Sequence, residues 1–139
     1  MSRVTVGVAG LGYWGPNLAR NFDELAALTW LCDLSAENRA RYTGRYPAAR
    51  VTADFDEMLA DDGLDAVVVA TPVPTHYELA RRALEAGKHV LVEKPPAMRG
   101  AEMDDLVSLA RARGLVLMPG HILLYHPGVT KLEELIQAG

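Results

Sequence analysis

A glycine-rich loop near the N-terminus has the spacing of a phosphate-binding turn. Gly10, Gly12 and Gly15 match G-x-G-x-x-G. In this pattern the first glycine allows a tight turn, the second lets the backbone approach a pyrophosphate, and the third lets a helix pack against a strand. A plain tight turn is the alternative, because glycine-rich turns are common. The loop follows an apolar run and opens a helical pattern, and this context favours phosphates held at a helix N-terminus.

An acidic residue follows at the distance expected for a ribose contact. Asp33 ends a second apolar run, eighteen residues after Gly15, and a carboxylate there is suited to accept hydrogen bonds from a ribose 2′-hydroxyl. It would also repel a 2′-phosphate, so the pattern favours NAD over NADP. Two alternatives stay open. Asp33 could instead cap the helix that begins near Ser35, and Arg39 and Arg41 are near enough to allow NADP.

Short apolar runs alternate with amphipathic segments along the whole chain, and these elements must position the loop and the acid. Strands are predicted at residues 4–9, 28–33, 50–52, 66–70, 89–93 and 115–118. The run at 66–70 is almost wholly apolar, which is typical of a central strand covered on both faces. Strands separated by helices cannot pair as hairpins. The fold predicted is therefore an α/β, Rossmann-type, doubly wound parallel sheet of about six strands.

Helix starts and stops follow from capping residues between these runs. Pro16 suits a first helical turn, with Leu18, Ala19, Phe22, Leu25 and Ala26 on one face, and Ser35 starts a helix that reaches about residue 46. Asp54 with Glu57, and Thr75 with Glu78, predict capping boxes. Gly87 and Gly114 end two helices, the second of which buries Met103, Leu106, Val107 and Ala110. A last helix covers about residues 127–137.

Composition excludes several classes of protein. The 139 residues suit one domain, and 50% hydrophobic with 23% charged residues excludes disorder. A net charge of −4 from interspersed charges is unlike a nucleic-acid binder. The single cysteine, Cys32, excludes a disulfide framework and a four-cysteine metal site, and it is expected to be a small core residue. We expect no metal, no nucleic acid and no membrane partner, and with neither a signal-peptide layout nor a membrane-length apolar run we expect a cytoplasmic protein.

Several ordered motifs resemble one family over essentially the whole chain. They are Gly10–Gly15, Ala70-Thr71-Pro72, His76, residues 86–90 and Glu93-Lys94-Pro95. Together they resemble the N-terminal NAD(P)-binding domain of the Gfo/Idh/MocA oxidoreductases. More narrowly, residues 12–17 and 120–127 resemble members that act on nucleotide-linked sugars.

The resemblance implies roles for particular residues. Lys94 would lie beside the nicotinamide and contact the substrate oxygen, a role that suits an ammonium group; the alternative is a surface lysine in a β–α turn. Glu93, Thr71 and Pro72 would contact the cofactor. Further candidates are Tyr13, His76, Pro95 and His121.

The roles of these further candidates are less specific, and most of them have an alternative explanation. Tyr13 would touch the pyrophosphate or cover the helix. For His76, helix capping and cofactor contact remain equal alternatives. Pro95, with a cis peptide before it, and His121 would lie on the substrate side, but a lone histidine such as His121 is more often structural.

The resemblance also implies a division of labour. Residues 1–120 would form the dinucleotide-binding domain, and residues 121–139 a crossover helix leading toward a substrate domain that this chain lacks. That domain would provide homo-oligomer contacts and a general acid/base histidine. The function implied is the cofactor half of an NAD(P)-dependent oxidoreductase acting on a sugar or nucleotide-sugar hydroxyl or ketone, inactive alone. The alternative is a stand-alone NAD-binding or sensor module without catalysis.

Overall fold

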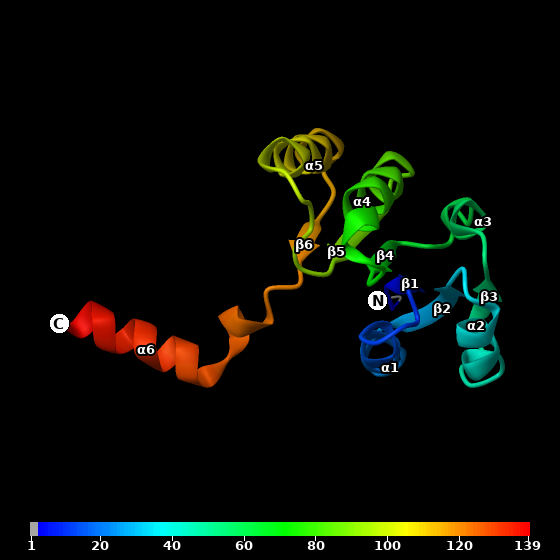
Figure 1. Cartoon of the computed structure of the whole chain (residues 1–139), viewed down its shortest axis with the longest axis horizontal. Coiled ribbons are helices and arrows are strands. Elements are labelled where there is room, and N and C mark those ends of the chain that lie inside the picture. The colour runs from blue at the N-terminus through cyan, green and yellow to red at the C-terminus, as the bar shows by residue number, and fades with distance from the viewer. Residues whose placement is uncertain (1–2) are drawn as a thin grey trace.

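Six parallel strands form one sheet in the computed structural model, which describes residues 3–139 (Figure 1). The strands are β1 (Thr5–Ala9), β2 (Ala27–Cys32), β3 (Arg50–Thr52), β4 (Ala66–Val69), β5 (His89–Val92) and β6 (Leu117–Pro119). Their order is β3-β2-β1-β4-β5-β6, and every neighbouring pair is parallel. The prediction of a doubly wound parallel sheet is confirmed.

Helices connect the strands and cover both faces of the sheet. They are α1 (Gly15–Leu25), α2 (Ala36–Tyr42), α3 (Phe55–Leu59), α4 (His76–Glu85), α5 (Gly100–Arg113) and α6 (Pro127–Ala138), with short 3-10 helices at Val73–Thr75 and Ile122–Tyr125. In Figure 1, α1 and α2 lie on one side of the sheet, and α3, α4 and α5 on the other. This is the arrangement that right-handed crossovers produce.

The central strand β4 shows why the sheet is covered twice. Val67 and Val69 pack into the core under α3, α4 and α5, whereas Val68 packs into the core under α1. All three side chains are almost completely buried. A run without polar alternation therefore forms a strand with two buried faces, as predicted.

The strand order reverses between β1 and β4. From β1 the chain builds outward to β2 and β3, and it then returns to place β4 on the other side of β1. The connections after β1 and β4 therefore leave in opposite directions. In such sheets this reversal opens a crevice at the carboxyl ends of the strands.

Several predicted boundaries were wrong for local reasons. The helix from Ser35 ends at Tyr42 rather than near residue 46, because Thr43 leaves the helical region and Gly44 has φ +78°. The strand predicted at 115–118 begins at Leu117, because the Leu115 N–H closes the end of α5 by donating to Ala110.

Side-chain predictions also need correction at three helices. Thr75 forms no capping box, because its hydroxyl donates to the carbonyl of Pro72 instead. Leu25 is 78% exposed, since α1 ends there and Ala26 turns into β2. Met103 and Val107 are only partly buried and line a shallow groove beside β6.

The segment after β6 leaves the sheet. In Figure 1 it extends away from the other elements as the 3-10 helix and α6. All residues from 121 to 139 are exposed, including the apolar side chains Leu132, Leu135 and Ile136. Within residues 3–139, no helix combines the length and apolar character that a membrane span requires.

Candidate functional site

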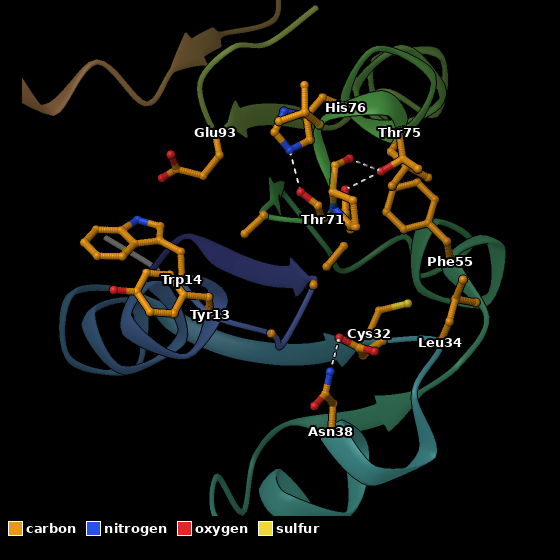
Figure 2. A pocket seen from close by; sticks show the side chains of 18 of the residues that line it. Tyr13, Trp14, Cys32, Leu34, Asn38, Phe55, Thr71, Thr75, His76 and Glu93 are labelled. Atoms are coloured by element: carbon orange, nitrogen blue, oxygen red, sulfur yellow. Dashed lines mark hydrogen bonds between the residues drawn. The ribbon is translucent and has the colours of Figure 1, made fainter.

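A large cavity opens at the carboxyl ends of the strands, where the strand order reverses. Its volume is about 1280 Å³, which exceeds the usual range for drug-sized ligands and suits a dinucleotide. Its walls come from the segments that follow β1, β2, β3, β4 and β5 (Figure 2). Most of the residues predicted from sequence line it: Gly10, Gly12, Tyr13, Asp33, Thr71, Pro72, His76, Glu93 and Lys94.

A side chain would meet different surroundings at each of the three glycines of the loop. Gly10 has φ +93°, and a Cβ there would lie 2.4 Å from the carbonyl oxygen of Ala70. At Gly15 a Cβ would lie 1.6 Å from the carbonyl oxygen of Gly10, so only glycine lets α1 begin this close to β1. At Gly12 a Cβ would meet nothing within 4 Å, because the position faces the open cavity.

Backbone donors of the loop point to an anion. The Leu11 N–H donates to Asp33 at 2.7 Å. The N–H groups of the next three residues, 12–14, have no acceptor within residues 3–139. They precede α1 directly, where the helix dipole adds partial positive charge. This cradle fits the pyrophosphate of a dinucleotide.

Asp33 links the end of β2 to the glycine loop. Its Oδ2 accepts from the Leu11 N–H and, at 3.3 Å, from the Asn38 side-chain amide, while Oδ1 accepts from the Ser35 N–H at 2.7 Å (Figure 2). Ser35, not Asp33, is the N-cap of α2. A carboxylate has about four acceptor positions, so one remains on Oδ1 for a ribose hydroxyl.

The nearby arginines have other partners. The Arg39 guanidinium donates to the backbone carbonyls of Asp33 and Leu34 at 2.7 and 2.8 Å. Arg41 is exposed and forms an ion pair with Glu37. Each guanidinium is engaged through one terminal nitrogen, Nη1 in Arg39 and Nη2 in Arg41, so these contacts leave both the NAD and the NADP interpretation open.

The opposite wall follows β4. The Thr71 hydroxyl shares a hydrogen bond of 2.7 Å with the Thr75 hydroxyl (Figure 2). His76 is 1% exposed, and its two ring nitrogens face backbone carbonyls rather than the open cavity. The prediction that His76 contacts a cofactor is untested, but any contact would involve the ring surface, because both nitrogens are occupied.

Lys94 and Glu93 lie together at one end of the cavity. Lys94 is exposed, and none of the ion pairs within residues 3–139 involves it. The Glu93 carboxylate lies against Gly120, where a Cβ would approach it to 3.0 Å. In Figure 2, Trp14 and Glu93 lie on opposite sides of this end. Trp14, Glu93 and Lys94 thus all contribute to the lining of the cavity.

Three predicted site residues do not line the cavity. Gly15 lies behind Gly10. Pro95 follows the cis Lys94–Pro95 peptide bond and is exposed. His121 is exposed at the start of the 3-10 helix after β6. That Pro95 and His121 lie on the substrate side stays a prediction.

Sequence reasoning missed the wall near β3. Leu34, Ala53, Phe55, Leu79 and Arg82 line the cavity there. Arg82 stacks over the Phe55 ring at 5.2 Å. The available signal was topological, since residues directly after β3 lie at the same edge as those after β2.

Cys32 borders the cavity but is not a reactive thiol. Burial is the largest cause that raises its pKa to about 11, and the carboxylates of Asp33 and Asp54 add to the shift. At neutral pH the thiol is therefore protonated and unreactive. Its expected role as a small core residue is confirmed by its burial.

The fold and the cavity define a dinucleotide-binding domain of the Rossmann type. The family model described as "Oxidoreductase family, NAD-binding Rossmann fold" matches residues 4–121. The chain belongs to this family, which is the Gfo/Idh/MocA family that the sequence motifs predicted.

Individual relatives are consistent with this assignment. The chain is 34% identical over 134 residues to UDP-N-acetylglucosamine 3-dehydrogenase of Acidithiobacillus ferrooxidans, covering 96% of the chain and 42% of that protein. It superposes with a TM-score of 0.91, at 36% identity, on GenD2 from gentamicin A biosynthesis in complex with NAD, covering 97% of the chain and 39% of GenD2.

A third relative was crystallised with the other nicotinamide cofactor. It is a 3-ketoreductase from Actinomadura kijaniata in complex with TDP-benzene and NADP, with a TM-score of 0.88 and 30% identity. The match covers 99% of the chain and 43% of that protein. The chain thus spans about 40% of the length of these relatives.

Two glycine substitutions should separate binding from folding. Gly12→Val should leave thermal stability close to wild type, since nothing lies within 4 Å of the added Cβ, but should abolish NAD binding. Gly15→Ala should lower the free energy of unfolding by about 1–3 kcal/mol or more, because the methyl group collides with the Gly10 carbonyl. Thermal unfolding and calorimetric titration with NAD measure the two effects. Normal NAD affinity in Gly12→Val would contradict the assignment of the cradle.

Proposed function

We propose that this chain is the cofactor-binding part of an oxidoreductase that moves hydride between a nicotinamide and a hydroxyl or ketone of a sugar or nucleotide sugar. The observation that supports this most strongly is the placement of Lys94 in the same cavity as the glycine cradle and Asp33. A binding module that only senses NAD does not require a free ammonium at this end of the cavity. The sugar class is supported by the relatives, which include a UDP-N-acetylglucosamine 3-dehydrogenase and a 3-ketoreductase in complex with TDP-benzene.

The residues divide between binding and chemistry. The N–H groups of residues 12–14 hold the pyrophosphate, and Asp33 accepts a hydrogen bond from the adenosine ribose. Thr71, Pro72 and Glu93 line the path between them and Lys94. NAD, when bound, accepts or supplies the hydride.

Lys94 has the chemistry to assist at the substrate oxygen. Its ammonium donates a hydrogen bond to that oxygen and lowers the free energy of the developing alkoxide. The proton must then pass to a general base. His76 is the one imidazole among the residues that line the cavity, and both of its ring nitrogens face backbone carbonyls, so we assign the role of general base to a residue of a second, substrate-binding domain.

Binding by the chain itself is the first test. Calorimetric titration of residues 1–139 should show NAD binding, because the cradle and the ribose acid are complete in this chain. A folded sample that shows no heat with millimolar NAD would refute the proposed function. Trp14, which lines the cavity, and the buried Trp30 provide a second signal through fluorescence quenching by NADH.

Asp33 should determine the choice between NAD and NADP. Asp33→Ser removes the carboxylate charge and the ribose hydrogen bond together, so the ratio of the two affinities should shift toward NADP by about 2–4 kcal/mol at most. Both absolute affinities should also fall, because the Leu11 N–H loses its partner. Asp62→Ser is the matched control, since Asp62 is an exposed aspartate that does not line the cavity. An unchanged ratio in Asp33→Ser would limit Asp33 to a structural role.

Lys94 should matter for turnover and not for cofactor affinity. In a protein that joins this chain to a substrate domain, Lys94→Met should bind NAD normally and turn over about 100–1,000-fold more slowly, because one preorganised donor is lost. The chain alone should show no steady turnover. Steady-state rates and NAD titrations make the comparison; normal turnover in Lys94→Met would remove Lys94 from the mechanism.

A further inference from the structure

His76 is a buried histidine between two turns that line the cavity. Its side chain is 1% exposed. Nδ1 lies 2.8 Å from the carbonyl oxygen of Pro95, and Nε2 lies 2.7 Å from the carbonyl oxygen of Thr71. The ring therefore bridges the turn after β4 and the turn after β5.

The turn that carries Lys94 has few other ways to be held. The last backbone hydrogen bond between β4 and β5 runs from the Glu93 N–H to the Val69 carbonyl, at 2.9 Å. Beyond it, Pro95 and Pro96 have no N–H to donate. Within residues 3–139, the acceptor of the Lys94 N–H is the carboxylate of its neighbour Glu93, at 3.3 Å. Backbone anchoring of this turn thus depends on its carbonyl groups. His76 contacts the carbonyl of Pro95, the residue that follows Lys94.

We propose that His76 is a positioning residue that fixes Lys94 relative to Thr71, with its Nδ1–H donating to the Pro95 carbonyl. The inference rests on the proposed role of Lys94. The Pro95 carbonyl is one residue from Lys94, so a shift of this carbonyl changes the direction in which the Lys94 side chain leaves the backbone. His76 itself does not touch the reacting atoms.

Two conservative substitutions test the two contacts of His76 separately. A carbonyl oxygen only accepts, and a neutral imidazole has a single N–H, so both contacts are hydrogen bonds only when both ring nitrogens carry a proton; the proposal itself requires the proton on Nδ1. The side-chain amide of asparagine places its nitrogen near the position of Nδ1, whereas that of glutamine reaches the position of Nε2. His76→Asn should therefore keep the link to Pro95 and lose the link to Thr71. His76→Gln should do the reverse.

The experiment reads the environment of Lys94 directly. The chain has three lysines, Lys88, Lys94 and Lys131. After reductive methylation with ¹³C-formaldehyde, the dimethylamino groups of the lysines should give three NMR signals, besides the signal of the N-terminal amine. Lys88 is buried with Nζ donating to Asp61, and Lys131 is exposed and paired with Glu134, so both serve as internal references.

The expected result is a change confined to Lys94. In the chain without NAD, His76→Gln should move the Lys94 signal toward that of an unstructured lysine, while His76→Asn should retain the wild-type position. The two reference signals should stay unchanged in both variants. On addition of NAD, the shift of the Lys94 signal seen in wild type should be lost in His76→Gln and kept in His76→Asn. His89→Asn is the matched control, because His89 accepts from Val116 and does not line the cavity.

Two outcomes would overturn the proposal. One is a wild-type Lys94 signal in a folded His76→Gln chain. The other is a wild-type ¹⁵N imidazole spectrum in which Nδ1 of His76 carries no proton, and this measurement remains decisive if His76→Gln fails to fold. Neither readout needs the cofactor. If the chain did not bind NAD, the proposed function would be refuted, but the result on His76 could still be interpreted.

Discussion

The close approach of α1 to β1 is the constraint on which the rest of the site depends. It is possible only because position 15 has no side chain, since a Cβ there would overlap the Gly10 carbonyl. This contact directs the N-terminus of α1 and the open N–H groups before it into the crevice between β1 and β4. The strand order then brings the segments after β2, β4 and β5 to the same edge. One steric condition in the loop thus determines where phosphates can lie relative to every other wall.

The two sides of the cavity are held by similar means. On one side, the Asp33 carboxylate after β2 accepts from the Leu11 N–H of the glycine loop. On the other, the His76 ring joins the turns after β4 and β5. In both cases a side chain from the segment after one strand contacts the backbone of a neighbouring segment. Such cross-links preorganise a site that consists mainly of loops.

Much of this arrangement follows from sequence because the signals are strong and local. Alternating apolar runs and helices determine a parallel sheet, and the glycine spacing with Asp33 determines the nucleotide end of the cavity. The errors arose where side chains compete with regular structure, as at Thr43 and Thr75, whose hydroxyls bond to nearby carbonyls. The bridge made by His76 could not be predicted, because it depends on the tertiary positions of two carbonyls. Phe55 and Arg82 were missed for the same reason, since only the folded sheet brings them to the cavity.

The central claim is that one cavity holds the cofactor in a single orientation, with its reactive end at Lys94. The most direct test is a crystal structure of the chain with NAD bound. The account predicts the pyrophosphate over the N–H groups of residues 12–14, the adenosine ribose at Asp33, and the nicotinamide in the region enclosed by Trp14, Glu93 and Lys94. A nicotinamide placed near Phe55, or NAD bound outside this cavity, would contradict it.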